Sequence, residues 1–195
     1  MLPDDANSQA AHELLCLAMV RFGDLSEAES IMLRAASDGR GAICLLNRST
    51  KNAEDKIENA WRPEQHIRSD LLRWLCINDA AGRLIDPRGI QILGAKFSGV
   101  LDLTDTRLCF PLSLCGCWFT EDILLISAHI PGLILSRSSV RSVVADRLTV
   151  GGSVFMRDGF AARAGVRLPG AEISGDLDCS GGTFNGTSEE SSLGS

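Results

Sequence analysis

The sequence predicts an α+β protein in which an N-terminal helical domain is followed by a parallel β-helix, a solenoid of about 22 residues per coil. Three observations lead to this prediction. The period of the apolar residues changes after residue 88 from helical spacing to alternation. Pairs of alternating apolar residues then recur mostly every 10–12 residues, and two such steps make one coil. Finally, the decapeptide GAKFSGVLDL at residues 94–103 returns as GAEISGDLDC at residues 170–179.

The change of period divides the chain into three parts: a helical capping domain at residues 1–87, the β-helix at residues 88–185 and a tail at residues 186–195. The boundary lies at Asp86 and Pro87, because a residue that precedes proline avoids the helical region of backbone conformation. The tail is polar and rich in Gly and Ser, so we expect it to be disordered.

Two helices are expected before residue 40. The first has an apolar face with helical spacing, formed by Ala11, Leu14, Leu15, Ala18 and Met19. The second begins at Ser26, where the segment SEAE predicts a capping box in which Glu29 bonds back to the cap amide. Gly39 is placed to end this helix, as glycine commonly does.

A third helix is expected to begin at Pro63, in the segment PEQHIRSDLLRWLCIND. Proline is tolerated in a first turn because its missing N–H would have no partner there. The apolar face of this helix consists of Ile67, Leu71, Trp74 and Leu75. A polar stretch precedes it, with a charged cluster at residues 51–58 that we expect to be partly mobile.

From Gly89 onward the pattern predicts short strands separated by Gly, Ser, Asp or Pro. The alternating apolar pairs, with a weaker slot near residues 143–145, are Leu101/Leu103, Leu112/Leu114, Ile123/Leu125, Leu133/Leu135, Val154/Met156, Val166/Leu168 and Leu177/Cys179. A second series of large apolar residues runs beside them: Phe97, Leu108, Phe119, Ile130, Val140, Phe160, Ile173 and Phe184. We expect about four coils in a rod roughly 20 Å long, with these four residues stacked inside: Phe97, Phe119, Val140 and Phe160.

The repeated decapeptide is predicted to mark the same corner and strand of the coil in both copies. The copies begin 76 residues apart (170 − 94), which is close to seven sub-repeats of about eleven residues. Strands of successive coils stack in parallel about 4.8 Å apart, so equivalent side chains form internal ladders. A single coil cannot bury its apolar face alone, whereas a stack of coils can.

Small residues often precede the large ones by two positions, as in Ala95-Lys96-Phe97, Cys117-Trp118-Phe119, Ala128-His129-Ile130 and Ala171-Glu172-Ile173. These steps resemble those of pentapeptide-repeat proteins over roughly residues 89–185. The resemblance implies a right-handed, four-sided β-helix with the small and large residues pointing inward. The whole arrangement is also similar to a group of uncharacterised bacterial proteins, in which a helix such as WRPEQHIRSDLLRWLC leads through IDPRGIQILGA into such a β-helix. Some of them are described as oxidoreductases, an activity that nothing in this sequence supports.

The bulk composition is that of an ordinary globular protein, with 45% hydrophobic residues and a net charge of −6. This charge makes neither nucleic acid nor an anionic membrane an electrostatic default partner. The longest apolar run, residues 14–20, is too short to span a bilayer, which needs roughly 20 residues. It follows an acidic start, which argues against a signal peptide. With seven cysteines and no export signal, we expect a cytoplasmic protein with reduced thiols.

The chain shows no motif for a cofactor or a metal. A dinucleotide fingerprint needs a helix after its glycines, and none is expected after Gly151-Gly152 or Gly181-Gly182. Cys115 and Cys117 are the only close pair of thiols, and zinc sites need two such pairs or spaced histidines as well. Cys117 instead fits a small inward position of the repeat. We therefore expect no cofactor and no metal.

No catalytic constellation is apparent either. His129 stands between two inward positions and should face solvent, without a thiol beside it. Asp residues at corners are usually turn residues, which is the expected role of Asp102, Asp105, Asp176 and Asp178. The sequence therefore predicts that the protein is not an enzyme.

A non-enzymatic protein that binds or scaffolds other proteins is the function that this architecture favours, because solenoids present long, regular surfaces. The alternative is a mimic of DNA that inhibits or protects a topoisomerase-type enzyme, a role that the pentapeptide-repeat resemblance implies. Residues 89–185 carry eight basic and nine acidic residues, far from the charge density of a duplex. The alternative therefore requires that the charges separate onto different faces.

Outward positions recur once per coil, so Lys96 and Trp118 form one column and Arg107 and His129 form another. These four residues are the candidate partner-binding residues. In the functional interpretation Trp118, flanked by cationic side chains, anchors a protein partner. In the alternative interpretation the columns are plain solvated surface, on which single apolar residues are normal.

The partner is expected to be a protein, with no direct binding of nucleic acid and no membrane. A further partner is a second copy of the chain. A bare last coil presents unpaired N–H and C=O groups, and the polar tail offers no apolar face to cover it. We therefore expect either further coils or self-association through the C-terminal edge of the solenoid.

Overall fold

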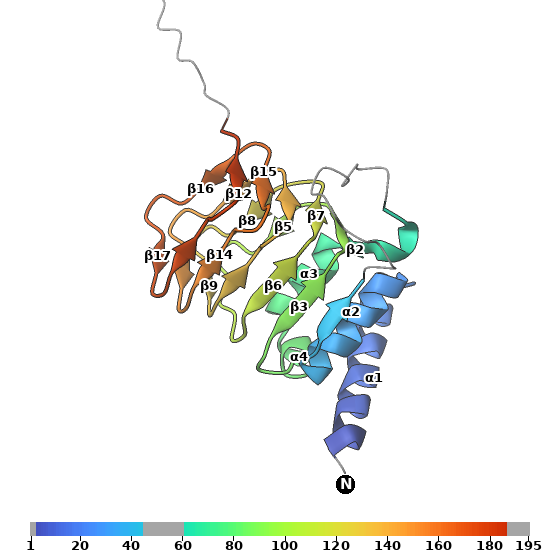
Figure 1. Ribbon diagram of the computed structural model, residues 1–195. Helices are drawn as coiled ribbons and strands as arrows, with labels where there is room; N and C mark the ends of the chain where they lie inside the picture. The colour runs from blue at the N-terminus through green and yellow to red at the C-terminus, as the bar shows by residue number, and fades with distance from the viewer. Residues whose placement is uncertain (1–2, 45–60, 187–195) are drawn as a thin grey trace, which may run out of the picture.

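The computed structural model describes residues 3–44 and 61–186 and confirms the predicted fold class. Helices at the N-terminal end are followed by parallel strands that stack as a solenoid of about four coils (Figure 1). The charged cluster at residues 51–58 and the tail from residue 187 onward lie outside the described residues.

The solenoid has four sides, here called faces A to D in the order in which the chain visits them. Face A consists of β1 (Gly41–Ile43), β3 (Ile90–Leu93), β6 (Leu112–Cys115), β10 (Leu133–Ile134), β14 (Val154–Phe155) and β18 (Leu177–Asp178). Face B consists of β2 (His66–Arg68), β4 (Lys96–Ser98), β7 (Trp118–Phe119), β11 (Ser139–Val140), β15 (Ala161–Ala162) and β19 (Thr183–Phe184). Face C consists of β5 (Leu101–Asp102), β8 (Ile123–Leu124), β12 (Val143–Val144) and β16 (Val166–Arg167). Face D consists of β9 (His129–Ile130), β13 (Thr149–Val150) and β17 (Glu172–Ile173).

Successive coils pair in parallel, and the length of a coil varies slightly along the solenoid. On face C, the step from Ile123 to its partner Val143 is shorter than the step from Val143 to its partner Val166. This variation explains the weak pattern near residues 143–145, where Val143 and Ala145 are nevertheless buried.

Aromatic stacking begins the internal ladder of face B. The rings of Phe97 and Phe119 are parallel within 4° and their centroids are 4.5 Å apart. Val140 follows in this column, but the next member is Ala162, because Ala162 and not Phe160 pairs with Val140. The prediction that Phe160 belongs to this stack is therefore wrong.

Phe160 occupies the neighbouring small-residue column, where it is fully buried. Large and small residues have thus exchanged places between positions 160 and 162, which keeps the volume of the coil nearly constant. The next coil accommodates the exchange with Gly182, since a Cβ there would come within 2.8 Å of the ring of Phe184.

The two copies of the decapeptide lie on different sides of the solenoid, which corrects the prediction that they share a corner. The first copy contains β4 and β5 and passes from face B to face C, whereas the second contains β17 and β18 and passes from face D to face A. Seven sub-repeats are an odd number of half-coils, so the second copy lies half a turn away from the first. The repeat therefore reflects a half-coil unit of strand, corner and strand.

The first two helices are α1 (Pro3–Phe22) and α2 (Glu27–Asp38). The predicted capping box is present: the Glu29 amide donates to Ser26 Oγ and the Ser26 amide donates to Glu29 Oε2, both at 3.0 Å. Gly39 ends α2 in the left-handed conformation, with φ of 65°. In α1, Leu14 and Ala18 are fully buried, but Met19 is 53% exposed and does not belong to the buried face.

The single helix expected from Pro63 is in fact divided. A 3₁₀ turn, η3 (Pro63–Gln65), precedes β2, and only then do α3 (Ser69–Ile77) and the short α4 (Asp79–Gly82) follow. Ile67 thus lies in a strand that pairs with β4, where it is fully buried opposite Phe97. Together with β1, this strand adds a partial coil before β3, and α3 packs against β5 on the side of face C.

The two ends of the solenoid are covered differently. At the N-terminal end α2 packs on β1, β2 and β3, and its Met32 and Leu33 are fully buried (Figure 1). In the last described coil Leu177 is 47% exposed and Phe184 is 39% exposed. The apolar core is therefore closed at one end and accessible at the other.

Candidate functional site

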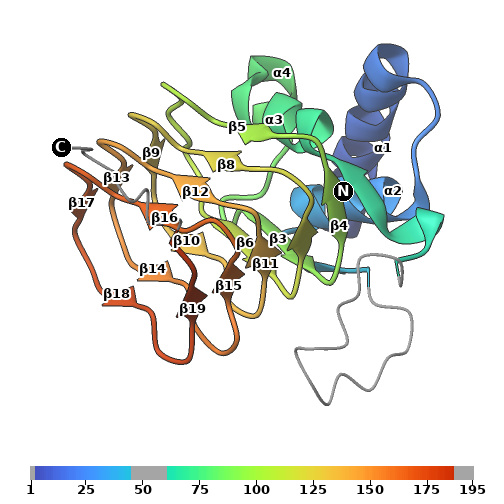
Figure 2. The same ribbon diagram turned by 90° about the horizontal axis from the view of Figure 1, so that it is seen from above.

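The outward columns have the register that the sequence predicts. Lys96 pairs with Trp118 on face B, and Arg107 pairs with His129 on face D. The strands of face D lie on the side of the solenoid away from those of face B (Figure 2). The four candidate residues therefore make two separate surfaces, one on each of two opposite faces.

On face B, Trp118 is half-buried beneath the side chain of Arg163. The guanidinium carbon of Arg163 lies 4.6 Å from the centroid of the indole ring, within the range of a cation–π interaction. Its Nη1 donates to Ser139 Oγ at 3.3 Å and its Nη2 donates to the carbonyl of Phe119 at 3.0 Å. These bonds hold the guanidinium in place over the ring.

The indole N–H of Trp118 is buried and finds no acceptor in the described part of the chain. His66, two strands away in the same column, also has a buried ring atom, Nε2, without a partner there. Burial, reinforced by the charge of Lys96, lowers the pKa of His66 below its ordinary value, so its ring is neutral at neutral pH. The positive charge of this column therefore comes from Lys96 and from Arg163 above Trp118.

Sequence reasoning did not single out Arg163. It lies 45 residues after Trp118 (163 − 118) and two residues beyond Ala161, which is the member of the Trp118 column two coils further on, so the coil spacing gives no signal for this contact. We call Lys96, Trp118, Ser139 and Arg163 the face-B site.

Face D presents a different surface. Its outward column continues from Arg107 and His129 to Thr149 and Glu172, without an aromatic residue beyond the histidine. Within the described residues neither Arg107 nor His129 makes a side-chain hydrogen bond or an ion pair. This column has the character of solvated surface.

The two buried thiols, those of Cys44 and Cys117, lie in an environment that suppresses their reactivity. Cys117 is fully buried in its small inward position, as predicted, and its Sγ donates to the carbonyl of Cys115 at 3.3 Å. Burial raises the pKa of Cys117 to about 12 and that of Cys44 to about 11, so both are protonated at neutral pH. Among the described residues there is no group of three or more His, Cys, Asp or Glu side chains that could hold a metal ion.

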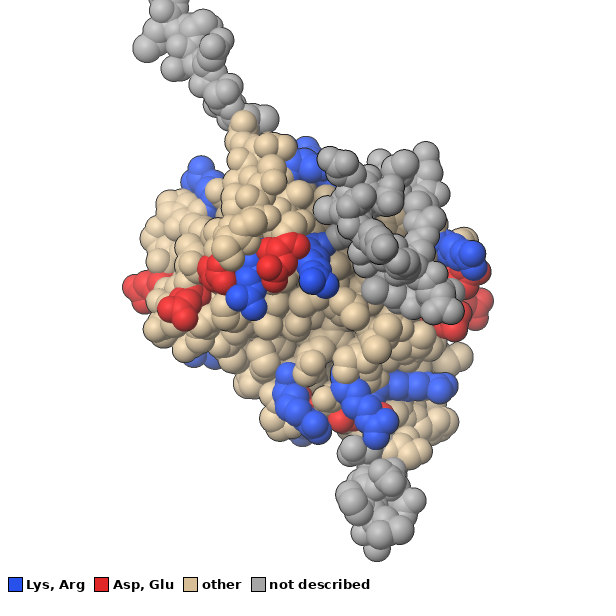
Figure 3. Space-filling model, viewed as in Figure 1, with Lys and Arg blue, Asp and Glu red and all other residues tan. Residues whose placement is uncertain are grey.

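Six acidic residues of the solenoid stand beside arginines and form ion pairs with them: Asp102, Glu121, Asp122, Asp146, Asp158 and Asp178. The face seen in Figure 3 shows mixed clusters of both signs around a broad uncharged area. Ion pairs of 2.8–3.4 Å join Arg141 to Glu121 and Asp122, Arg157 to Asp178, and Arg167 to Asp146. Asp102 and Asp178 also have the expected turn role, accepting from the amides of Thr104 and Ser180.

Comparison of the chain with protein-family models, curated proteins and solved structures gave no significant match. None of the helices described is both long enough and apolar enough to cross a membrane. The surfaces of the molecule are therefore the basis on which its function is inferred.

Proposed function

We propose that the chain is a non-enzymatic scaffold that binds a protein partner at the face-B site. The observation that carries this proposal is the stack of Arg163 on Trp118 on an otherwise regular solenoid side. Trp and Arg are the residues that most often dominate the energy of protein interfaces. Their mutual contact fixes both side chains before a partner arrives, which reduces the conformational entropy lost on binding.

The chemistry of the site indicates the kind of partner surface that fits it. Lys96 and Arg163 give the column positive charge, which matches acidic side chains on a partner. The buried indole N–H of Trp118 lacks an acceptor among the described residues, and an unsatisfied buried donor costs roughly 1–3 kcal/mol. Because this nitrogen is buried, a carboxylate or carbonyl oxygen of a partner would remove the cost only if the side chains around the ring move on binding.

The test uses the intact chain as bait in its native host, with quantitative mass spectrometry of the captured proteins. The variants Trp118→Ala and Arg163→Ala are compared with Arg107→Ala, a matched loss of a cation on face D. We expect at least one captured protein to fall about tenfold or more with both face-B variants and to persist with Arg107→Ala, since hot-spot residues are worth about 2 kcal/mol or more. If Trp118→Ala leaves every captured protein unchanged, the face-B site is not the docking surface.

Self-association through the C-terminal end of the solenoid is a second candidate, favoured by the exposure of Leu177 and Phe184. A second copy offers the same edge, so a two-fold contact would be self-complementary. Light scattering of dilute and concentrated protein tests this candidate. Phe184→Asp should shift the chain toward the monomer, and a wild-type chain that stays monomeric when concentrated would exclude the contact.

The DNA-mimic alternative has no comparable observation in its favour, because most of the acidic residues of the solenoid form ion pairs with arginines. The pentapeptide-repeat resemblance, by contrast, is supported by the inward columns. Small residues at positions 95, 117 and 138 precede large ones at 97, 119 and 140 in successive coils, all of them buried. We propose on this basis that the coil is of the pentapeptide-repeat type, with an exchange at positions 160 and 162.

A further inference from the structure

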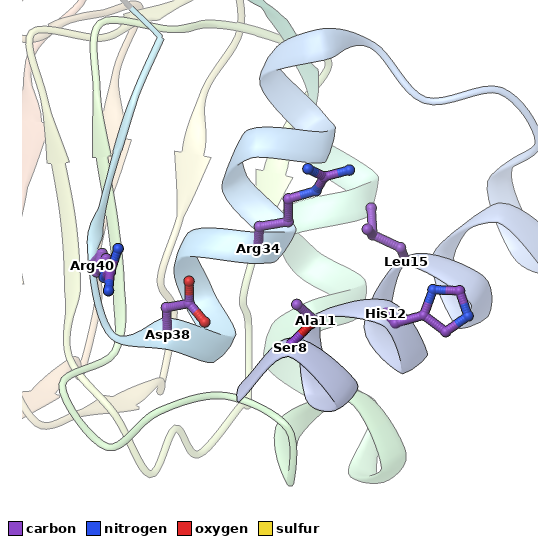
Figure 4. A pocket seen from close by; sticks show the side chains of 7 residues that line it. All are labelled: Ser8, Ala11, His12, Leu15, Arg34, Asp38 and Arg40. Atoms are coloured by element: carbon purple, nitrogen blue, oxygen red, sulfur yellow. The ribbon is translucent and has the colours of Figure 1, made fainter. Parts of the chain in front are cut away.

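A thiol and an imidazole converge on the exposed side of α1. Cys16 follows His12 by four residues, so the two side chains share one face of the helix. The Sγ atom of Cys16 lies 3.7 Å from Nε2 of His12, and both residues are exposed. Figure 4 shows His12 at the edge of the hollow between α1 and α2, with its ring turned away from Asp38 and Arg40. The pair therefore faces outward and is accessible to a metal ion.

The distance between these two atoms matches one edge of a tetrahedral zinc centre. Zinc binds thiolate sulfur at about 2.3 Å and imidazole nitrogen at about 2.0–2.1 Å. With a tetrahedral angle between these two bonds, the sulfur and the nitrogen lie about 3.6 Å apart. Two ligands spaced four residues apart on one face of a helix are also the arrangement by which metalloprotease helices hold zinc. Cys16 and His12 are thus spaced to bind one zinc ion together.

The pair supplies only half of a zinc site. Structural zinc takes four protein ligands, and two cysteines with two histidines are one of its common sets. No third His, Cys, Asp or Glu side chain of the described residues joins His12 and Cys16. A second copy of the chain supplies the two missing ligands, because a two-fold axis through the metal repeats the same pair.

The same side of α1 also offers apolar surface to a second copy. Met19 and Val20 follow Cys16 by three and four residues, so they lie next to it along the helix surface. Met19 is 53% exposed and Val20 is 89% exposed. A contact centred on the metal would bury part of this apolar area, which adds to the stability of the paired state.

We propose that α1 binds Zn²⁺ between two copies of the chain, with His12 and Cys16 of each copy as the four ligands. The Cys16 thiol releases its proton to water as the Zn–S bond forms, because thiolate is the form that binds metal. Two thiolates neutralise the charge of Zn²⁺, so the contact buries no net charge. The sequence-based expectation of no metal rested on Cys115 and Cys117, which lie on the solenoid. The site depends neither on the face-B site nor on the C-terminal end.

Equilibrium dialysis against Zn²⁺ and light scattering test this inference on the intact, untagged chain, with a non-thiol reductant present. We expect about one zinc ion for two chains and a dimer that a chelator returns to the monomer. The same dimer should form in Phe184→Asp, which separates it from self-association through the C-terminal end. Co²⁺ in place of Zn²⁺ should give the visible absorption bands of tetrahedral cobalt together with a thiolate-to-cobalt charge-transfer band.

Two pairs of matched variants make the result specific. His12→Gln and Cys16→Ser should each weaken zinc binding more than about a hundredfold and abolish the zinc-dependent dimer, since loss of an outer-shell partner alone costs roughly 10–100-fold. His129→Gln and Cys109→Ser, which remove a histidine and an exposed thiol on the solenoid, should leave both unchanged. His12 and Cys16 are exposed, so their replacement should not alter the circular dichroism spectrum.

Three outcomes would count against the zinc site. No saturable binding of zinc, or binding that Cys16→Ser leaves unchanged, would overturn the inference. One zinc ion bound to each monomeric chain would overturn the role of the second copy. A dimer that forms without metal and is separated by reductant would identify a disulfide between two Cys16 residues in place of a zinc site.

Discussion

The two ends of the solenoid are built from similar coils but differ in what lies over them. At the N-terminal end β1 and β2 extend faces A and B, and α2 covers the layer, so that Leu33 and Ile67 are completely buried. At the C-terminal end the last described coil contributes Leu177 and Phe184, which remain 47% and 39% exposed. A coil therefore buries its own apolar residues only where another layer lies on each side, as expected for a stack in which each unit contacts only its neighbours.

The contribution of an apolar residue to stability therefore depends more on the coil in which it lies, inner or terminal, than on which amino acid it is. Phe119 and Phe184 belong to the same inward column of face B, separated by Val140 and Ala162. Phe119 is 0% exposed between two layers, whereas Phe184 has a described layer on one side only. Substitutions at matched positions of inner and end coils test this interpretation.

The largest difference is expected for a charge placed in this column. Phe119→Asp should abolish folding, because an unpaired carboxylate would be buried among apolar side chains. Phe184→Asp should leave a folded protein in which only the last coil is loosened. Circular dichroism and thermal melting of both variants measure the difference. A folded, β-rich Phe119→Asp protein would show that the register of the column is wrong.

Truncation of leucine at the two ends should give a smaller but still clear contrast. Leu33→Ala leaves a cavity within the core beneath α2, and such changes in a core cost about 2–5 kcal/mol. Leu177→Ala removes a side chain that is 47% exposed and should cost about 1 kcal/mol or less. Urea unfolding of the two variants gives both values. Equal losses of stability would mean that the C-terminal end is covered in solution, and self-association would then be the first explanation to test.

Much of this fold can be predicted from the sequence because alternation is a local signal that each strand carries itself. The features that were not predicted depend on contacts between distant segments. The triplets of β1 and β2 have no strand pattern of their own and become strands by pairing with β3 and β4. The position of Phe160 depends on the length of one coil. With the short step that joins β8 to β12 on face C, Phe160 would follow Val140 in the column of large residues on face B. The step on face B from Ser139 to its partner Ala161 is longer, so Ala162 follows Val140 instead.

For the candidate site as well, the register of the outward residues could be predicted from the sequence, whereas the side-chain contact between distant coils could not. The length of one coil correctly places Lys96 beside Trp118 and Arg107 beside His129. Lys96 and Arg107 are half a coil apart in the chain, so their positions in the sequence already imply opposite faces. The contact of Arg163 with Trp118 could not be predicted from register, because it depends on a long side chain that reaches back across two coils.

An ion pair at the covered end should make its stability depend on pH. Burial alone would raise the pKa of Glu29, but hydrogen bonds from Arg68 and the Ser26 amide hold it below the ordinary value. The stabilisation is therefore complete above the unfolded pKa of about 4.3 and is lost as the pH falls through the lower pKa of the folded state. Glu29→Gln keeps the capping geometry but removes the charge, and should cost about 1–3 kcal/mol at neutral pH.

The measurement is urea unfolding of the wild type and Glu29→Gln between neutral pH and about pH 3, a range that crosses the ordinary carboxyl pKa. The two proteins should converge in stability as the pH falls. Asp178 at the open end, where Ser180 and Arg157 lower the carboxyl pKa, provides the comparison, since its side chain is 29% exposed against 3% for Glu29. Asp178→Asn should show a smaller difference at neutral pH, because water screens its ion pair. A constant gap between wild type and Glu29→Gln across this range would exclude the ion pair as its cause.

The smallest expected effect on stability comes from the corners between faces C and D. The residue in the left-handed conformation at this corner differs between the inner coils and the last one. The inner coils place Asp105, Ser127 and Arg147 at φ of 53–55° in this corner, whereas the last coil places Gly170 there at 67°. The left-handed conformation costs an L-residue about 1–2 kcal/mol, and glycine adopts it without that cost but loses more backbone entropy on folding. Arg147→Gly should therefore raise the free energy of unfolding by up to about 1 kcal/mol, which corresponds to a few degrees in the melting temperature.

Thr104→Gly is the control, because Thr104 precedes the left-handed residue and is not itself in that conformation, so glycine there should only destabilise. If both glycine variants lower the melting temperature equally, the left-handed conformation of Arg147 does not cost the folded protein stability. The presence of glycine at position 170 would then have another cause.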